Sequence, residues 1–143
     1  MLDQILTRLT GELGTSTHII PLFKSAIQDS REVLREQFEA GEPVLELVQR
    51  HSDFMDGILQ LAWHRFIWNE NAQAWRKSRV ALIAVGGYGR RELLPNSDID
   101  VMILLERQNQ STHRANIQSF TTLLWDIGVK VGHSVRSLPD CRT

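Results

Sequence analysis

The chain has 143 residues, 42% of them hydrophobic, with a single Cys and 16 Lys and Arg against 17 Asp and Glu. This profile is typical of a globular protein, and it excludes wholesale disorder, a fibrous repeat and an internal disulfide framework. No apolar run approaches the roughly 20 residues that span a bilayer, and the first residues lack the basic region of a signal peptide. We therefore expect a cytoplasmic protein that does not bind membranes.

Charge is divided unevenly along the chain. Residues 1–72 carry six Lys and Arg with eleven Asp and Glu (net −5), whereas residues 73–143 carry ten and six (net +4). A mildly basic C-terminal half could receive an anionic ligand. The excess is too small and too scattered to predict a nucleic acid as the partner.

The first half of the chain shows helical periodicity. Within residues 17–40, apolar residues recur at helical spacing from about Pro21, and Gly41 is a stop signal. Residues 42–70 predict either one long helix or two helices joined near Ser52, which could cap a second helix. We interpret Trp63, Trp68 and Trp75 as residues that pack helices together and not as a platform for base stacking.

The period of the pattern changes after residue 79. Residues 80–85 form a short apolar run that ends at two glycines, which predicts a strand buried on both faces. Residues 88–94 predict a short helix that Pro95 closes. The pattern then predicts a strand at 98–105, a helix at 111–127 that stops at Gly128, and a strand at 129–135.

These elements predict an α/β (α+β) fold. A helical N-terminal segment would occupy residues 1–75, and a mixed β-sheet with flanking helices would occupy residues 76–143. The last residues look like the approach to another helix, so we expect the second domain to be incomplete at its C-terminal end.

Two features near the predicted strands point to chemistry. Gly86 and Gly87 follow the first strand, and backbone without Cβ atoms can approach a phosphate chain closely. Asp98 and Asp100 are two residues apart on the second strand, so both carboxylates project to the same side. Hard oxygen ligands of this kind suit Mg²⁺, and substrate phosphates and water then complete its octahedral coordination. The glycine pattern does not fit a dinucleotide-binding fold, which needs G-x-G-x-x-G and a longer helix.

Two segments carry a family resemblance. The stretch AVGGYGRRELLPNSDID at residues 84–100 resembles the signature of the polymerase-beta-like nucleotidyltransferases, a Gly-Gly turn about ten residues ahead of an Asp-x-Asp strand. Within that superfamily the chain is most similar to the PII uridylyltransferase family, because LWDIGVKVGHSVR at residues 124–136 also resembles the segment that follows the signature there.

The resemblance implies Mg²⁺-dependent transfer of UMP from UTP to a tyrosine of the PII nitrogen-regulatory protein, with release of pyrophosphate. By position, Gly86 and Gly87 would bind the triphosphate, and Asp98 and Asp100 would be the catalytic metal ligands. Ser97 would help to set the approach of the metal strand. Arg90 and Arg91 could steer the triphosphate, and His133 is interpreted as a structural residue.

The chain also departs from the family pattern. The family expects a third carboxylate from a later strand, and residues 129–137 offer none, so we expect it beyond Thr143. The HD and ACT domains of full-length members are absent, which indicates an N-terminal fragment. Two alternatives stay open: a non-catalytic nucleotide-binding or interaction fragment, and a related nucleotidyltransferase such as glutamine synthetase adenylyltransferase. The downstream GVKVGHSVR segment argues against the second.

Overall fold

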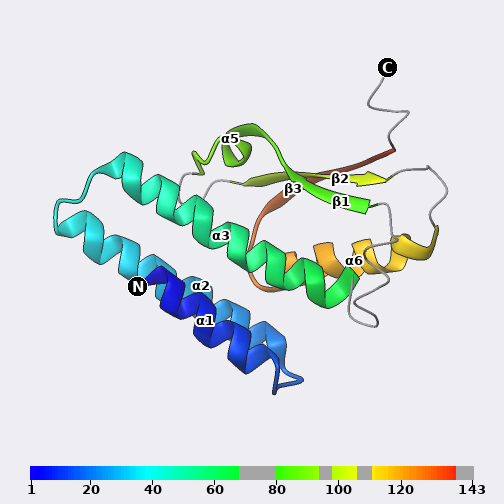
Figure 1. Cartoon of the computed structure of the whole chain (residues 1–143), viewed down its shortest axis with the longest axis horizontal. Coiled ribbons are helices and arrows are strands. Elements are labelled where there is room, and N and C mark those ends of the chain that lie inside the picture. Colours follow the sequence, from blue (N-terminus) through cyan, green and yellow to red (C-terminus); the bar gives the residue numbers. More distant parts are fainter. Residues whose placement is uncertain (68–79, 94–97, 106–110, 138–143) are drawn as a thin grey trace.

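The computed structural model describes residues 1–67, 80–93, 98–105 and 111–137 (Figure 1). The α/β class is confirmed, with a helical N-terminal part and a small mixed sheet. The helices are α1 (Leu2–Leu13), α2 (Ile19–Glu39), α3 (Val44–Ile67), α5 (Gly86–Gly89) and α6 (Ser111–Asp126), and the strands are β1 (Val80–Ala84), β2 (Ile99–Leu105) and β3 (Val131–Ser137). The predicted domain boundary at residues 75 and 76 lies outside the described residues.

Apart from the short α5, the helices lie on one side of the sheet. Figure 1 shows α3 and α6 beneath the strands, with α1 and α2 packed on the far side of α3. Gly41 and Gly128 adopt φ of 89° and 87°, so both predicted helix stops are confirmed. A left-handed residue ends a helix readily when it has no Cβ atom. None of the helices in the described ranges is long and apolar enough to cross a membrane.

Three expectations about the elements were incomplete or wrong. Helix α1 was not predicted, and α3 is one continuous helix, which settles the alternative that had been left open. The short helix after β1 spans residues 86–89 and not 88–94, so it begins at the glycines themselves. Tertiary hydrogen bonds to α3, described below, hold the residues that follow it in a non-helical path.

The sheet has the order β1-β2-β3, with β1 antiparallel and β3 parallel to the central strand β2. The prediction that β1 is buried on both faces was wrong, because Ala81 and Ala84 are exposed. Among the residues that the structure describes, β1 pairs with β2 alone, and the long helices cover one face of the sheet. Its short apolar run reflects a place at the margin of the core and not at its centre.

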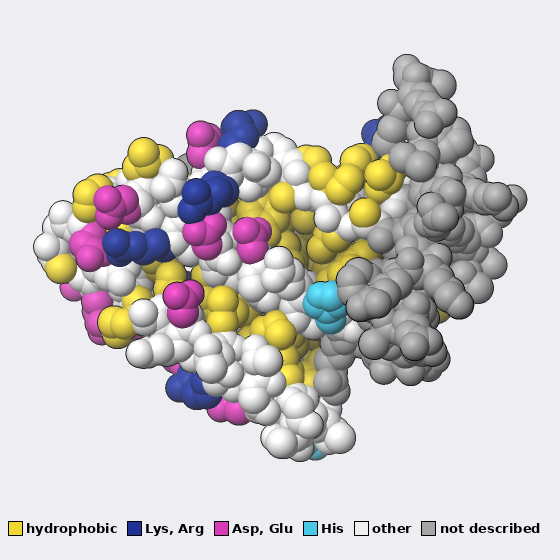
Figure 2. Space-filling view, in the orientation of Figure 1, with side chains coloured by type: hydrophobic (Ala, Val, Ile, Leu, Met, Phe, Trp, Pro, Cys, Tyr) yellow, Lys and Arg dark blue, Asp and Glu magenta, His cyan; other side chains and the backbone are white. Residues whose placement is uncertain are grey.

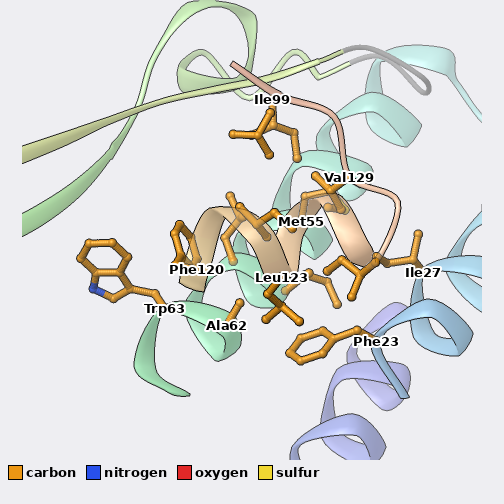
Figure 3. Packing of buried hydrophobic residues seen from close by; sticks show 14 of the residues in the cluster. Phe23, Ile27, Met55, Ala62, Trp63, Ile99, Phe120, Leu123 and Val129 are labelled. Carbon is orange, nitrogen blue, oxygen red and sulfur yellow. The ribbon is translucent and has the colours of Figure 1, made fainter. Parts of the chain in front are cut away.

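Side chains alternate across β2 between the core and the opposite face. Ile99, Val101 and Ile103 are at most 3% exposed and point toward the helices. Figure 3 shows Ile99 directed from the sheet toward the helical layer. Trp63 of α3 packs edge-on against Phe120 of α6, with ring centroids 5.2 Å apart, which confirms a packing role for this tryptophan. Asp100 of β2 therefore lies on the face that the helices leave uncovered.

Candidate active site

A glycine turn connects β1 to the short helix α5. Gly86 adopts φ of 63°, a left-handed conformation that disfavours side chains. The chain then closes on itself, because the Gly89 N–H donates to the Val85 carbonyl at 3.0 Å. A methyl group on Gly89 would lie 2.8 Å from the Ala84 carbonyl oxygen, so this position excludes any side chain while the backbone keeps its place. The turn is thus a tight structure that glycine alone permits.

The carboxylate of Asp100 lies beside this turn. A methyl group on Gly86 would be 3.1 Å from Asp100 Oδ2, and a methyl group on Gly132 would be 2.7 Å from Asp100 Oδ1. Backbone pairing brings these residues together. Asp100 of β2 is the register partner of Gly132 in β3, and the Asp100 carbonyl accepts the Val85 N–H at 3.0 Å. Asp100 therefore occupies a space that exists because both neighbouring positions lack a Cβ atom.

Asp98 stands immediately before β2 and is exposed, as Asp100 is. Ile99 between them is buried, and side chains alternate along a strand, so the two acids share the uncovered face. The backbone at this point is fixed by the Ile99 N–H, which donates to the Lys130 carbonyl at 2.8 Å. The sheet therefore places the Asp100 carboxylate at the end of β2 that adjoins the glycine turn, and the exposed Asp98 directly precedes that end.

Helix α3 holds the turn from below through a buried tyrosine. The Tyr88 side chain is 5% exposed, and its hydroxyl donates a short hydrogen bond to the carboxylate of Asp56. Burial, and then the hydrogen bond and negative charge of Asp56, raise the pKa of Tyr88 far above its ordinary value. The phenol therefore stays protonated and anchors α5 to α3.

Two further α3 residues fix the segment that follows α5. Ser52 is 1% exposed, and its hydroxyl accepts the Leu93 N–H at 2.9 Å while donating to the Val48 carbonyl at 3.0 Å. Arg91 forms two hydrogen bonds to Asp53, at 2.9 and 2.7 Å. The hydrogen bonds to Asp53, and then its negative charge, raise the pKa of this guanidinium. Ser52 is thus an internal anchor and not the helix cap that the sequence suggested.

The two arginines of the signature have different surroundings. Arg91 is engaged by Asp53, which assigns its side chain to a structural contact. Arg90 is exposed, with Nε 3.4 Å from Glu92, and one of its terminal nitrogens would lie 3.9 Å from a methyl group on Gly87. It is therefore the arginine whose guanidinium lies at the glycine turn. Ser97 lies outside the described residues.

Sequence reasoning did not identify the α3 residues or Gly132 as parts of this site. Ser52 is buried and Asp56 is half-buried on α3, and polar side chains in such places need partners. Asp53 lies beside them on the exposed side of the same helix. Gly132 lies inside a strand, where glycine often marks a close approach by another group. Both signals were present in the sequence, but the partner in each case comes from a distant segment.

The oxygen ligands that this site offers suit a hard cation, but they are few. Asp98 and Asp100 supply exposed carboxylate oxygens of the kind that bind Mg²⁺, and the glycines beside Asp100 leave space around its carboxylate. Within the described ranges, no group of three or more His, Cys, Asp or Glu residues is arranged to hold a metal ion. A third protein ligand to such an ion is thus absent from that part of the chain.

Comparison with known proteins agrees with this geometry. Residues 28–134 match the family described as "Putative nucleotidyltransferase DUF294". The chain is 48% identical over 131 residues to a bifunctional uridylyltransferase/uridylyl-removing enzyme of Azotobacter vinelandii, and 47% identical over 131 residues to the one of Pseudomonas fluorescens. It is 44% identical over 135 residues to the one of Stutzerimonas stutzeri.

These alignments cover 92–94% of this chain but only 14% of each relative, so the chain spans about one seventh of their length. No solved structure matches the chain significantly. The family match includes α3, the glycine turn, the acids of β2 and most of β3. The chain therefore belongs to the nucleotidyltransferase family DUF294.

Proposed function

We propose that this chain carries the uridylyltransferase site of a PII-modifying enzyme, which transfers UMP from UTP to a tyrosine hydroxyl of PII with Mg²⁺. The observation that carries the proposal is the Asp100 carboxylate, which lies between Gly86 and Gly132 with Asp98 on the same face. A pair of carboxylates beside the glycine turn suits a metal-bound triphosphate better than it suits an uncharged ligand.

Each residue then has a defined task. Gly86 and Gly87 let the triphosphate approach the backbone because no Cβ atom intervenes. Arg90 extends from the same turn into solvent, where it can meet the phosphate oxygens. Asp98 and Asp100 would hold Mg²⁺, which when bound neutralises phosphate charge and orients the reacting oxygens.

The reaction is an in-line displacement at the α-phosphorus of UTP. The tyrosine oxygen of the acceptor forms a bond to that phosphorus, the bond to the bridging oxygen of the β-phosphate breaks, and pyrophosphate leaves with that electron pair. The hydroxyl proton passes to solvent or to a base. Positioning and charge neutralisation supply most of the rate enhancement in such reactions, so this chain need not provide a covalent nucleophile.

The choice of nucleotide and acceptor rests on similarity. The relatives that match the chain are named for uridylyl transfer and removal, which favours UTP over ATP as the donor. PII is the acceptor that the sequence resemblance implies. The proposal includes a cytoplasmic location, where the single Cys would remain reduced.

The proposal is tested with UTP labelled at the α-phosphate, purified PII and Mg²⁺. We expect label on PII, and we expect Asp98→Asn and Asp100→Asn each to reduce the transfer rate by about 10²–10³-fold, since a metal contributes several kcal/mol. Asp29→Asn is the matched control, because Asp29 is a half-exposed acid of α2 that pairs with Arg8 and lies on an element away from β2 and the glycine turn. Equal loss of transfer in the control would contradict the assigned roles.

A second candidate is a non-catalytic nucleotide-binding fragment. It is favoured by the absence of a third acidic ligand from the described part of the site. This candidate predicts that UTP binds and that no label reaches PII at any Mg²⁺ concentration. Transfer that depends on Asp98 and Asp100 would exclude it.

A further inference from the structure

A cavity of about 520 Å³ opens between α2, α3 and the segment that joins α6 to β3. Its volume falls within the range of sites that hold small organic ligands. Most of the wall is apolar, with side chains that include Ile27, Leu34, Met55, Leu93, Ile99 and Val129. Figure 3 shows Ile27, Met55, Ile99 and Val129 converging from the two helices, the sheet and the α6–β3 segment. We call this space the α2–α3 cavity.

All charged side chains that line the α2–α3 cavity are basic. They are Arg31, Arg35 and Lys130, and no carboxylate of the described residues belongs to the wall. Arg35 is engaged by Glu32 at 2.7 Å and by Glu39 at 3.3 Å. Arg31 and Lys130 are exposed and form no ion pair with any described residue. Two basic side chains thus stand at an apolar cavity without acidic partners, which favours an anionic ligand.

A buried polar atom at the same cavity also lacks a partner. His51 lines the wall, and its Nδ1 is buried without a hydrogen bond to any described residue. Burial, and then the positive charge of Arg31, lower the pKa of His51, so the ring is neutral at pH 7. A neutral imidazole has one N–H donor and one acceptor nitrogen, and a buried ring nitrogen without a partner costs free energy. In the tautomer that protonates Nδ1, a ligand oxygen can recover that free energy by accepting the N–H.

The rim of the cavity continues onto exposed apolar surface. Phe38 and Val44, on either side of the turn between α2 and α3, are 61% and 58% exposed. Figure 2 shows hydrophobic side chains among charged ones at this end of the molecule. The apolar part of a ligand would therefore meet apolar contacts from the interior of the cavity out to its rim.

We propose that the α2–α3 cavity binds a small amphipathic anion, whose apolar body fills the cavity and whose carboxylate lies against Arg31, Lys130 and His51. This site is separate from the proposed uridylyltransferase site. Ile99 lines the cavity, whereas its neighbours Asp98 and Asp100 point to the opposite face of the sheet. The proposal therefore stands or falls independently of nucleotidyl transfer.

Decanoate is the probe, titrated below its micelle concentration into the ¹⁵N-labelled chain and followed by NMR and calorimetry. Decanol and decylammonium carry the same alkyl chain with a neutral or positive head, and they are the ligand controls. We expect decanoate to shift the amide resonances of Leu34, Met55 and Val129 and to bind at least tenfold more tightly than either control. Equal affinity for the three ligands would overturn the proposal, because an apolar groove alone would explain it.

Variants of the charged and polar wall residues test whether they bind the carboxylate of the ligand. Arg31→Glu combined with Lys130→Glu should weaken decanoate binding at least tenfold, and His51→Phe should weaken decanoate binding but not decanol binding. Lys24→Glu is the matched control, because Lys24 is an exposed base of the same helix that does not line the cavity. Circular dichroism checks that each variant is folded.

Unchanged decanoate affinity in the double variant, or equal loss in Lys24→Glu, would overturn the proposal. Absence of decanoate binding would overturn it too. If sedimentation instead shows that the chain self-associates through Phe38 and Val44, the surface is an interface between copies and the ligand assignment is wrong.

Discussion

Substitution of Gly132 by Ala should move the Asp100 carboxylate while leaving the fold intact. The added methyl group would lie 2.7 Å from Asp100 Oδ1, whereas ordinary contact begins at 3.4 Å, so the oxygen must shift by about 0.7 Å. The obstacle is the end of a side chain and not backbone, so the free energy of unfolding should change by less than about 1 kcal/mol. A displacement of about 1 Å at a reacting site can reduce the rate by about 10²-fold.

The assay is transfer of labelled UMP to PII over a range of Mg²⁺ concentrations, with thermal melting of each variant measured in parallel. Gly132→Ala should lower the transfer rate by about 10–10²-fold, raise the Mg²⁺ concentration needed, and leave the melting temperature nearly unchanged. Gly11→Ala is the control, because a methyl group there meets nothing within 4 Å in helix α1. An unchanged rate and Mg²⁺ requirement in Gly132→Ala would refute the placement of Asp100 at the metal.

Three further predictions concern the turn and its anchors. Gly89→Ala should destabilise the fold by about 1–3 kcal/mol in urea denaturation, because its methyl group would lie 2.8 Å from a β1 carbonyl oxygen; stability equal to wild type would show that the turn relaxes freely. Ser52→Ala should cost about 1–3 kcal/mol, since the buried Leu93 N–H loses its acceptor; a change of only a few tenths would mean that water replaces the hydroxyl. Tyr88→Phe should cost about 1.5–3 kcal/mol by removing the hydrogen bond to Asp56. Because the pKa of Tyr88 is raised in the folded state, the stability that its hydroxyl contributes is fully present below pH about 10 and declines as the pH rises above that value. Tyr88→Phe should lack this decline. Parallel pH profiles of stability in the wild type and the variant would contradict the assignment.

The positions of most elements could be predicted because each depends on local pattern. Apolar residues at helical spacing located α2, α3 and α6, and the glycine stops at residues 41 and 128 adopt the expected left-handed conformation. The spacing of Asp98 and Asp100 predicted a common face, and the burial of Ile99 between them agrees with it. Local periodicity fixes which face a residue occupies.

What could not be predicted depends on contacts between distant segments. The path after Gly86 is set by Tyr88 and Leu93 bonding to α3, and no local pattern reports these contacts. The edge position of β1 follows from strand order, which an apolar run does not encode. Gly132 meets Asp100 only because β3 pairs in parallel with β2 in one register. The sequence thus indicated the acids and the turn, while the fold explains why they lie together.

The central claim is that the acids of β2 and the glycine turn hold one metal-bound triphosphate. It is tested most directly by adding Mn²⁺, which binds oxygen ligands as Mg²⁺ does, together with UTP to the ¹⁵N-labelled chain. The claim predicts paramagnetic broadening centred on the amides of Gly86, Gly87, Asp100 and Gly132, and its loss in the Asp98→Asn, Asp100→Asn double variant. Broadening centred elsewhere in the chain, or unchanged broadening in the double variant, would contradict it.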